Sequence, residues 1–184
     1  PLFHQHLQKS NLVYSYPQIH YLILNGKAII FGIKNGADAI PKLFTDIDEL
    51  IMGTEKYPIL DKQLSIKTHT FNLIEYDKRY FFVTPWLALN EVNFMKFRDA
   101  DWMTRKKMLS QILIGNILSA LKGLKIKVEK RINVEIIYVR TVSCSLKGSS
   151  LIGFYGSFKI NLELPPLFGV GKSVSRGFGA ILEE

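Results

Sequence analysis

The start of the chain is dominated by the apolar, β-branched and aromatic side chains that are typical of β-strands. Residues 12–24 are rich in β-branched and aromatic side chains and predict a strand, in which Pro17 suggests an edge position or a bulge. Asn25-Gly26 is a strong signal for a two-residue turn, so residues 27–33 are predicted to form the returning strand. The first predicted unit is therefore a β-hairpin.

The pattern then changes to the period of a helix. Apolar residues recur every three or four positions within residues 36–52, which predicts a helix over that range. Residues 64–73 alternate and predict a strand. A second hairpin is predicted from residues 71–76 and 80–86, with Asp77-Lys78 as its turn.

The second half of the chain contains the clearest helix. Residues 101–124 carry an apolar stripe at helical spacing and follow a connector that is predicted to hold a short helical turn. Residues 132–143 and 151–164 predict two strands that are joined by a turn at residues 147–150. A glycine-rich loop and a short final strand complete the order of elements.

This order predicts an α+β protein of two tandem ferredoxin-like domains, residues 1–75 and residues 76–184. The second half reads as strand, long helix, hairpin, loop and strand, which is a ferredoxin-like unit whose second helix is reduced or replaced by loop. The first half reads as the same unit without its first strand and most of its first helix. Because the chain begins at Pro1, we expect the missing elements to precede it.

The composition adds a class of partner to this picture. With 47% hydrophobic and 22% charged residues, the 184-residue chain has the composition of a soluble globular protein. No apolar segment is long enough for a membrane span, and the single cysteine, Cys144, cannot form an internal disulfide, so we expect a cytoplasmic protein without a membrane partner. The formal net charge of +8 favours a polyanionic partner.

The most distinctive stretch is Gly169–Gly179, which reads GVGKSVSRGFG. Glycine permits positive φ and a close approach of the backbone, and successive bare N–H groups in such a loop form a concavity that binds anions. Its lysine and arginine make phosphate the expected anion. The spacing fits neither a Walker A loop nor a dinucleotide-binding motif, so a mononucleotide pocket is not expected.

The four histidines are the other candidates for chemistry. His4 and His6 lack a third ligand nearby, and neither His20 nor His69 has ligand-like spacing to them, so no metal or other cofactor is expected. Imidazole is suited to moving protons at neutral pH, as required when an RNA 2′-OH attacks its adjacent phosphate. In an extended segment His4 and His6 would share one face, because side chains at i and i+2 do so. The alternative is that His4 and His6 form a solvent-exposed pair in a loop. His20 is either a third participant or simple variation, and His69 is expected to be structural.

The pattern G-x-G-x-x-x-x-R-G-F-G resembles the C-terminal glycine-rich loop of the RAMP superfamily, and most closely that of the Cas-six family of CRISPR-associated endoribonucleases. The segments Phe3–His6, Tyr14–Pro17 and Ile19–Tyr21 look like the N-terminal signature of one archaeal and bacterial branch of that family. The resemblance implies two tandem ferredoxin-like (RAMP/RRM-like) domains. It also implies a metal-independent endoribonuclease that cuts CRISPR repeat RNA and leaves a 2′,3′-cyclic phosphate and a 5′-hydroxyl.

The resemblance also assigns roles to residues. It makes His4 and His6 the candidate catalytic residues, with His4 the first choice. The candidate RNA-binding residues are Tyr14, Tyr16, Gly169, Gly171, Lys172, Ser173, Ser175, Arg176, Gly177 and Gly179. For the two tyrosines, stacking on bases or bonding to the scissile phosphate competes with simple packing.

The implied partner is a CRISPR repeat transcript, and a second copy of the chain or subunits of a CRISPR effector complex are further candidates. Two alternatives stay open at this point. One is a RAMP-fold protein that binds RNA without cutting it. The other is a structural or regulatory ferredoxin-like domain whose basic face is incidental.

Overall fold

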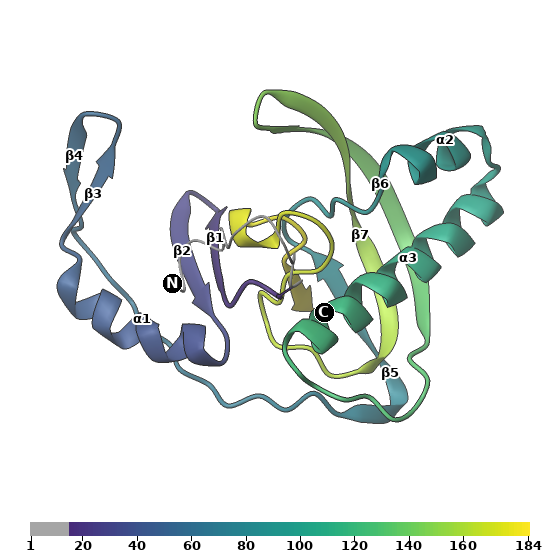
Figure 1. The fold of residues 1–184 in the computed structure, drawn as a ribbon, viewed down its shortest axis with the longest axis horizontal. Coiled ribbons are helices and arrows are strands. Elements are labelled where there is room, and N and C mark those ends of the chain that lie inside the picture. Colours follow the sequence, from purple (N-terminus) through teal and green to yellow (C-terminus); the bar gives the residue numbers. More distant parts are fainter. Residues whose placement is uncertain (1–14) are drawn as a thin grey trace, which may run out of the picture.

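The computed structural model describes residues 15–184 and is of the α+β class, as predicted. In chain order the elements are β1 (Ile19–Leu24), β2 (Lys27–Gly32), α1 (Asn35–Asp46), β3 (Glu49–Met52), β4 (Glu55–Pro58), β5 (Leu73–Phe82), α2 (Glu91–Asp99), α3 (Trp102–Gly123), β6 (Val134–Leu146), β7 (Ser149–Leu162), the 3-10 turn η1 (Val174–Arg176) and β8 (Ile181–Glu183). Figure 1 shows α1 with the hairpins β1–β2 and β3–β4 on one side, and the larger sheet with α2 and α3 on the other.

The four-stranded sheet has the order β6-β7-β5-β8, with every neighbouring pair antiparallel. Helix α3 lies across this sheet (Figure 1) and confirms the helix predicted for residues 101–124. Leu109, Leu113 and Ile117 are fully buried on α3, because residues four apart share one face of a helix. They join the aromatic side chains of β5 and β7 in one hydrophobic core, which holds the helix against the sheet.

Strand β5 corrects the predicted hairpin around Asp77-Lys78, which is wrong. Residues Leu73–Phe82 form one strand that runs between β7 and β8, with an irregularity in register before Lys78. The Lys78 ammonium lies 3.1 Å from Glu163 and 3.1 Å from Glu183. Hydrogen bonds to Glu163 and then Glu183 raise the pKa of Lys78, so the charge that suggests a turn is instead paired across the sheet.

The β1–β2 hairpin confirms the predicted turn at Asn25-Gly26, where both residues have positive φ (51° and 75°). Helix α1 is shorter than predicted, because Ile47 takes an extended conformation and the next residues form the hairpin β3–β4. The strand predicted for residues 64–73 is also wrong over most of its length. Residues 59–72, all of which the structure describes, contain no strand, and Ile66 faces solvent with 73% of its surface exposed.

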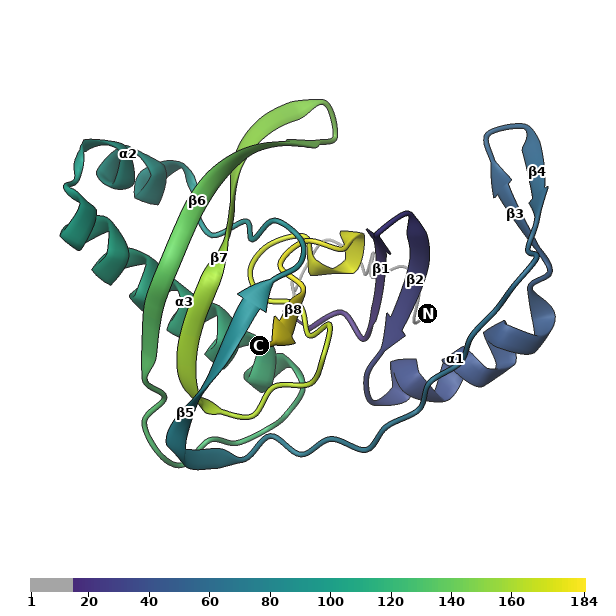
Figure 2. The ribbon, with the colours of Figure 1, turned by 180° about the vertical axis from the view of Figure 1, so that it is seen from behind.

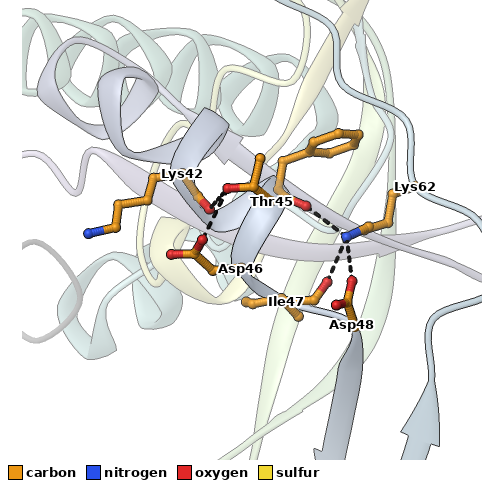
Figure 3. A network of polar contacts seen from close by, with 7 residues as sticks. Lys42, Thr45, Asp46, Ile47, Asp48 and Lys62 are labelled. Carbon is orange, nitrogen blue, oxygen red and sulfur yellow. Dashed lines mark hydrogen bonds and ion pairs between the residues drawn. The ribbon is translucent and has the colours of Figure 1, made fainter.

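The hairpin β3–β4 projects from the far end of α1 (Figures 1 and 2), and all of its residues are exposed. The segment that follows returns along α1. There the Lys62 ammonium donates to the carbonyl oxygens of Phe44 and Ile47 at 2.8 and 2.9 Å and pairs with Asp48 at 2.9 Å (Figure 3). Lys62 therefore caps the C-terminus of α1 from outside the helix.

No helix within residues 15–184 combines the length and the apolar character that a membrane crossing requires.

Candidate functional site

The glycine-rich loop packs tightly against the rest of its own chain. A Cβ atom at Gly171 would lie 2.7 Å from the Trp86 ring, and one at Gly177 would lie 2.5 Å from the carbonyl oxygen of Tyr21. Both glycines also have positive φ (95° and 83°). A side chain at either position would therefore clash with its neighbours and would strain the backbone. Gly169, Gly177 and Gly179 are buried, whereas Gly171 is half-buried. The glycines thus hold the loop between β1 and the Trp86 region of the C-terminal half.

Tyr16 fastens the loop from the N-terminal side. Its hydroxyl donates to the carbonyl oxygen of Gly169 at 2.8 Å and accepts from the Gly169 amide at 3.2 Å. Its ring stacks on Phe168 with centroids 5.2 Å apart, and only 2% of the residue is exposed. The Tyr16 ring is thus enclosed by packing within the chain. The predicted contact of Tyr16 with RNA stays a prediction.

A pocket of about 420 Å³ lies between α3, the segment before β1 and the glycine-rich loop. Its lining residues are Ser15, Tyr16, Pro17, Asn116, Ser119 and residues 171–175. The structure therefore brings together five residues of the sequence-predicted site, which are Tyr16, Gly171, Lys172, Ser173 and Ser175. The Lys172 ammonium donates to the carbonyl oxygen of Leu89 at 2.8 Å, which holds this side chain along the connector after β5.

Two further groups of predicted residues are not part of this pocket lining. Arg176 is exposed on η1 and is absent from the described lining of the pocket. His4, His6 and Tyr14 lie outside the described residues.

Two other histidines are placed clearly. His20 is 2% exposed, and its Nε2 donates to the carbonyl oxygen of Pro17 at 2.8 Å. Burial lowers the pKa of His20 to about 4, so it is neutral at neutral pH and serves the core. His69 is exposed on the segment before β5, edge-on to Phe71 with ring centroids 5.7 Å apart. Within residues 15–184, no three His, Cys, Asp or Glu side chains gather closely enough to hold a metal ion.

Sequence reasoning missed Asn116 and Ser119, which bring α3 into the pocket wall. They are three residues apart and so share a face of the helix. That spacing was the sole signal in the sequence, because nothing local connects them to the glycine-rich loop.

Comparison with known proteins gives the family. Two family models match the chain, the Cas6b N-terminal domain over residues 1–70 and the Cas6b C-terminal domain over residues 72–183. A crystal structure described as Cas6b is 32% identical with a TM-score of 0.88, and the match covers 96% of this chain and 82% of that chain. A second, described as the CRISPR RNA processing endoribonuclease Cas6b, is 31% identical with a TM-score of 0.76 and coverages of 93% and 83%.

An uncharacterized protein of Methanocaldococcus jannaschii is 33% identical over 141 residues, which are 77% of this chain and 96% of that protein. The fold and the glycine-rich loop thus define a CRISPR-associated protein of the Cas-six (Cas6) type, and the resemblance seen in the sequence is confirmed. Within that class, the chain belongs to the Cas6b family.

Proposed function

We propose that the protein is an endoribonuclease that processes CRISPR repeat RNA without a metal ion. The observation that carries this proposal is the match to both Cas6b domain models, over residues 1–70 and 72–183. It is supported by the pocket in which Lys172, Ser173 and Ser175 meet the segment that begins at Ser15. His4 and His6, the proposed proton-transfer groups, precede Ser15 of this pocket by eleven and nine residues in the sequence.

The proposed reaction is an internal transesterification of the RNA. The 2′-oxygen forms a bond to the adjacent phosphorus while the bond from phosphorus to the 5′-oxygen of the next nucleotide breaks. One histidine, His4 or His6, takes the proton from the 2′-OH, and the other gives a proton to the departing oxygen. Positive and hydrogen-bonding groups of the glycine-rich loop, with Lys172 and Arg176 first among them, stabilise the negative charge that builds on the phosphorane. The products carry a 2′,3′-cyclic phosphate and a 5′-hydroxyl.

We further propose that the chain is built from two ferredoxin-like domains, residues 1–75 and 76–184. Supporting this, the C-terminal elements follow the order β5, α3, β6, β7, β8, with sheet order β6-β7-β5-β8 and η1 in the position of a second helix. The boundary lies inside β5, close to the junction of the two family models between residues 70 and 72. The proposed partner is the CRISPR repeat transcript, and a second copy of the chain or effector subunits are candidates for assembly.

Cleavage of the repeat RNA in EDTA tests the activity. We expect the wild-type protein to cut, and His4→Ala or His6→Ala to slow cleavage by at least about 100-fold with binding nearly unchanged, since each proton transfer contributes 10²–10⁴ in rate. His69→Ala, which removes an exposed imidazole elsewhere, is the matched control. Intact RNA that is bound but never cut would identify a non-catalytic RNA-binding protein instead.

A further inference from the structure

Asn116 lines the pocket and is held by a hydrogen bond from the core. The buried Trp86 indole donates from Nε1 to Oδ1 of Asn116 at 3.0 Å. An indole N–H can only donate, so the accepting atom must be the amide oxygen, and the orientation of the side-chain amide follows. The two N–H groups on Nδ2 are therefore the groups of Asn116 that can serve a ligand.

Trp86 is itself held by packing and backbone hydrogen bonds, and its indole therefore fixes the orientation of the Asn116 side chain. The Trp86 ring stacks on Phe82 with centroids 5.2 Å apart and an interplanar angle of 5°. Its backbone exchanges two hydrogen bonds with Phe154, at 2.8 and 2.9 Å. Asn116 thus connects the pocket wall to the centre of the core, and its side-chain amide is held by a well-packed partner.

The rest of the pocket wall suits an anion. Ser119 lies three residues beyond Asn116 on the same face of α3, and Ser173 and Ser175 of the loop line the same pocket. These groups all can donate hydrogen bonds. Lys172 also lines the pocket and carries a positive charge, which is held at the carbonyl oxygen of Leu89. Of the residues that the structure describes around the pocket, none is acidic. A phosphodiester, whose free oxygens only accept hydrogen bonds, is the ligand group that fits this wall.

We infer that the pocket between α3 and the glycine-rich loop binds a phosphodiester of the RNA strand, and that Asn116 and Ser119 are RNA-binding residues. This inference rests on the proposed function and extends its binding site from the loop onto α3. A purely structural role for Asn116, as acceptor for Trp86, is the competing explanation.

Asn116→Asp separates the two explanations. The carboxylate keeps an oxygen to accept from the Trp86 indole, but it replaces the two donors with a negatively charged acceptor. A structural role tolerates this change, whereas a phosphate-binding role does not. Gln111→Glu is the matched control, because it makes the same amide-to-carboxylate change at an exposed position of α3 outside the pocket.

The experiment measures affinity for the repeat RNA and for a scrambled RNA of the same length, together with thermal unfolding. We expect Asn116→Asp to weaken binding of both RNAs by about tenfold or more, because charge-assisted hydrogen bonds are lost and repulsion replaces them. Gln111→Glu should weaken binding by less than about twofold, since an exposed charge is screened. Ser119→Asp places a carboxylate in the same pocket without touching the Trp86 contact, and serves if Asn116→Asp does not fold.

The outcomes separate the two proposals. If folded Asn116→Asp or Ser119→Asp binds RNA as well as Gln111→Glu does, the inference is overturned, while wild-type cleavage would leave the proposed function intact. A loss confined to the repeat sequence would overturn the phosphodiester assignment in favour of a base contact. A wild-type protein that neither binds nor cuts RNA would overturn both.

Discussion

His20 links the stability of the core to pH at the level of a single residue. Burial lowers its pKa from 6.5 to about 4 in the folded protein. The unfolded chain therefore takes up a proton that the folded chain resists, so this contribution to stability is complete above pH 6.5 and is lost as the pH falls toward 4. We expect the free energy of unfolding, measured by urea denaturation, to fall by about 2 kcal/mol from pH 7.5 to pH 5 because of this residue.

Two variants check the assignment. His20→Gln should flatten this part of the pH profile, because the titrating group is gone. His69→Gln removes an exposed histidine and should leave the profile as in the wild type. An unchanged profile in His20→Gln would show that another group controls the acid side of the stability curve.

Gly177 and Gly115 give a second residue-scale prediction, with opposite signs. A methyl group at Gly177 would require a left-handed backbone in a residue with a Cβ and would press on the carbonyl oxygen of Tyr21. Gly177→Ala should therefore cost about 1–3 kcal/mol of stability and weaken RNA binding through the displaced loop. A methyl group at Gly115, in α3, meets nothing within 4 Å, so Gly115→Ala should stabilise the protein by about 0.5–1 kcal/mol. Urea denaturation of both variants checks the signs.

At the scale of an element, Lys62 stabilises the C-terminal end of α1. The last turn of α1 contains no basic residue, and the Lys62 ammonium supplies the missing donors to the carbonyl oxygens of Phe44 and Ile47. We expect Lys62→Met to cost the end of α1 about 1 kcal/mol of local stability, seen as faster hydrogen exchange of its last amides. Lys56→Met, which removes an exposed pair with Glu49, should leave those amides unchanged. Equal effects of the two variants would rule out a specific cap.

Elements with a strong local signal were predictable from the sequence. Asn25-Gly26 forms the expected turn, and Asp101 caps α3 by accepting from the Thr104 amide at 2.9 Å. The elements that were predicted wrongly depend on pairing that the local pattern does not specify. Lys78 lies within a strand and pairs with Glu163, which directly follows β7, and with Glu183 of β8. The apolar residues after α1 fit a helix as well as a strand, and pairing with β4 decides between them.

The candidate site was predictable to the same extent. The glycine-rich loop could be found from its own residues, because its composition is a local property of the sequence. Asn116 could not, because its importance arises from a contact with Trp86, thirty positions away, and from a pocket wall shared with the loop. The role of Tyr16 was likewise hidden, since its hydroxyl meets Gly169 across almost the whole chain.

At the scale of the whole molecule, the loop sits where the two halves of the chain meet. Tyr16 fastens it from one half, and the Trp86 region, including Pro85 and Leu87, borders it from the other. Figures 1 and 2 show η1 beside the β1–β2 hairpin, with β8 returning into the larger sheet. A ligand bound at this junction contacts groups from both halves, so the proposed site depends on the correct assembly of the entire fold.

The position of Arg176 at this junction leads to a prediction about the salt dependence of RNA binding. A protein with a net charge of +8 attracts RNA from a distance, and this attraction alone does not locate a binding site. A phosphate contact is recognised by its salt dependence. In a plot of the logarithm of the affinity against the logarithm of the salt concentration, each contact to a single strand adds about 0.7 to the downward slope.

We expect Arg176→Ala to reduce that slope by about 0.7, since Arg176 is exposed on η1 beside the pocket-lining residues of the loop. Arg79→Ala removes the same charge, but its guanidinium pairs with Glu184 at 2.9 Å, so the slope should stay as in the wild type. Equal slopes for the two variants, measured by titration at several salt concentrations, would mean that Arg176 contributes only to the general field and that the RNA path does not cross η1.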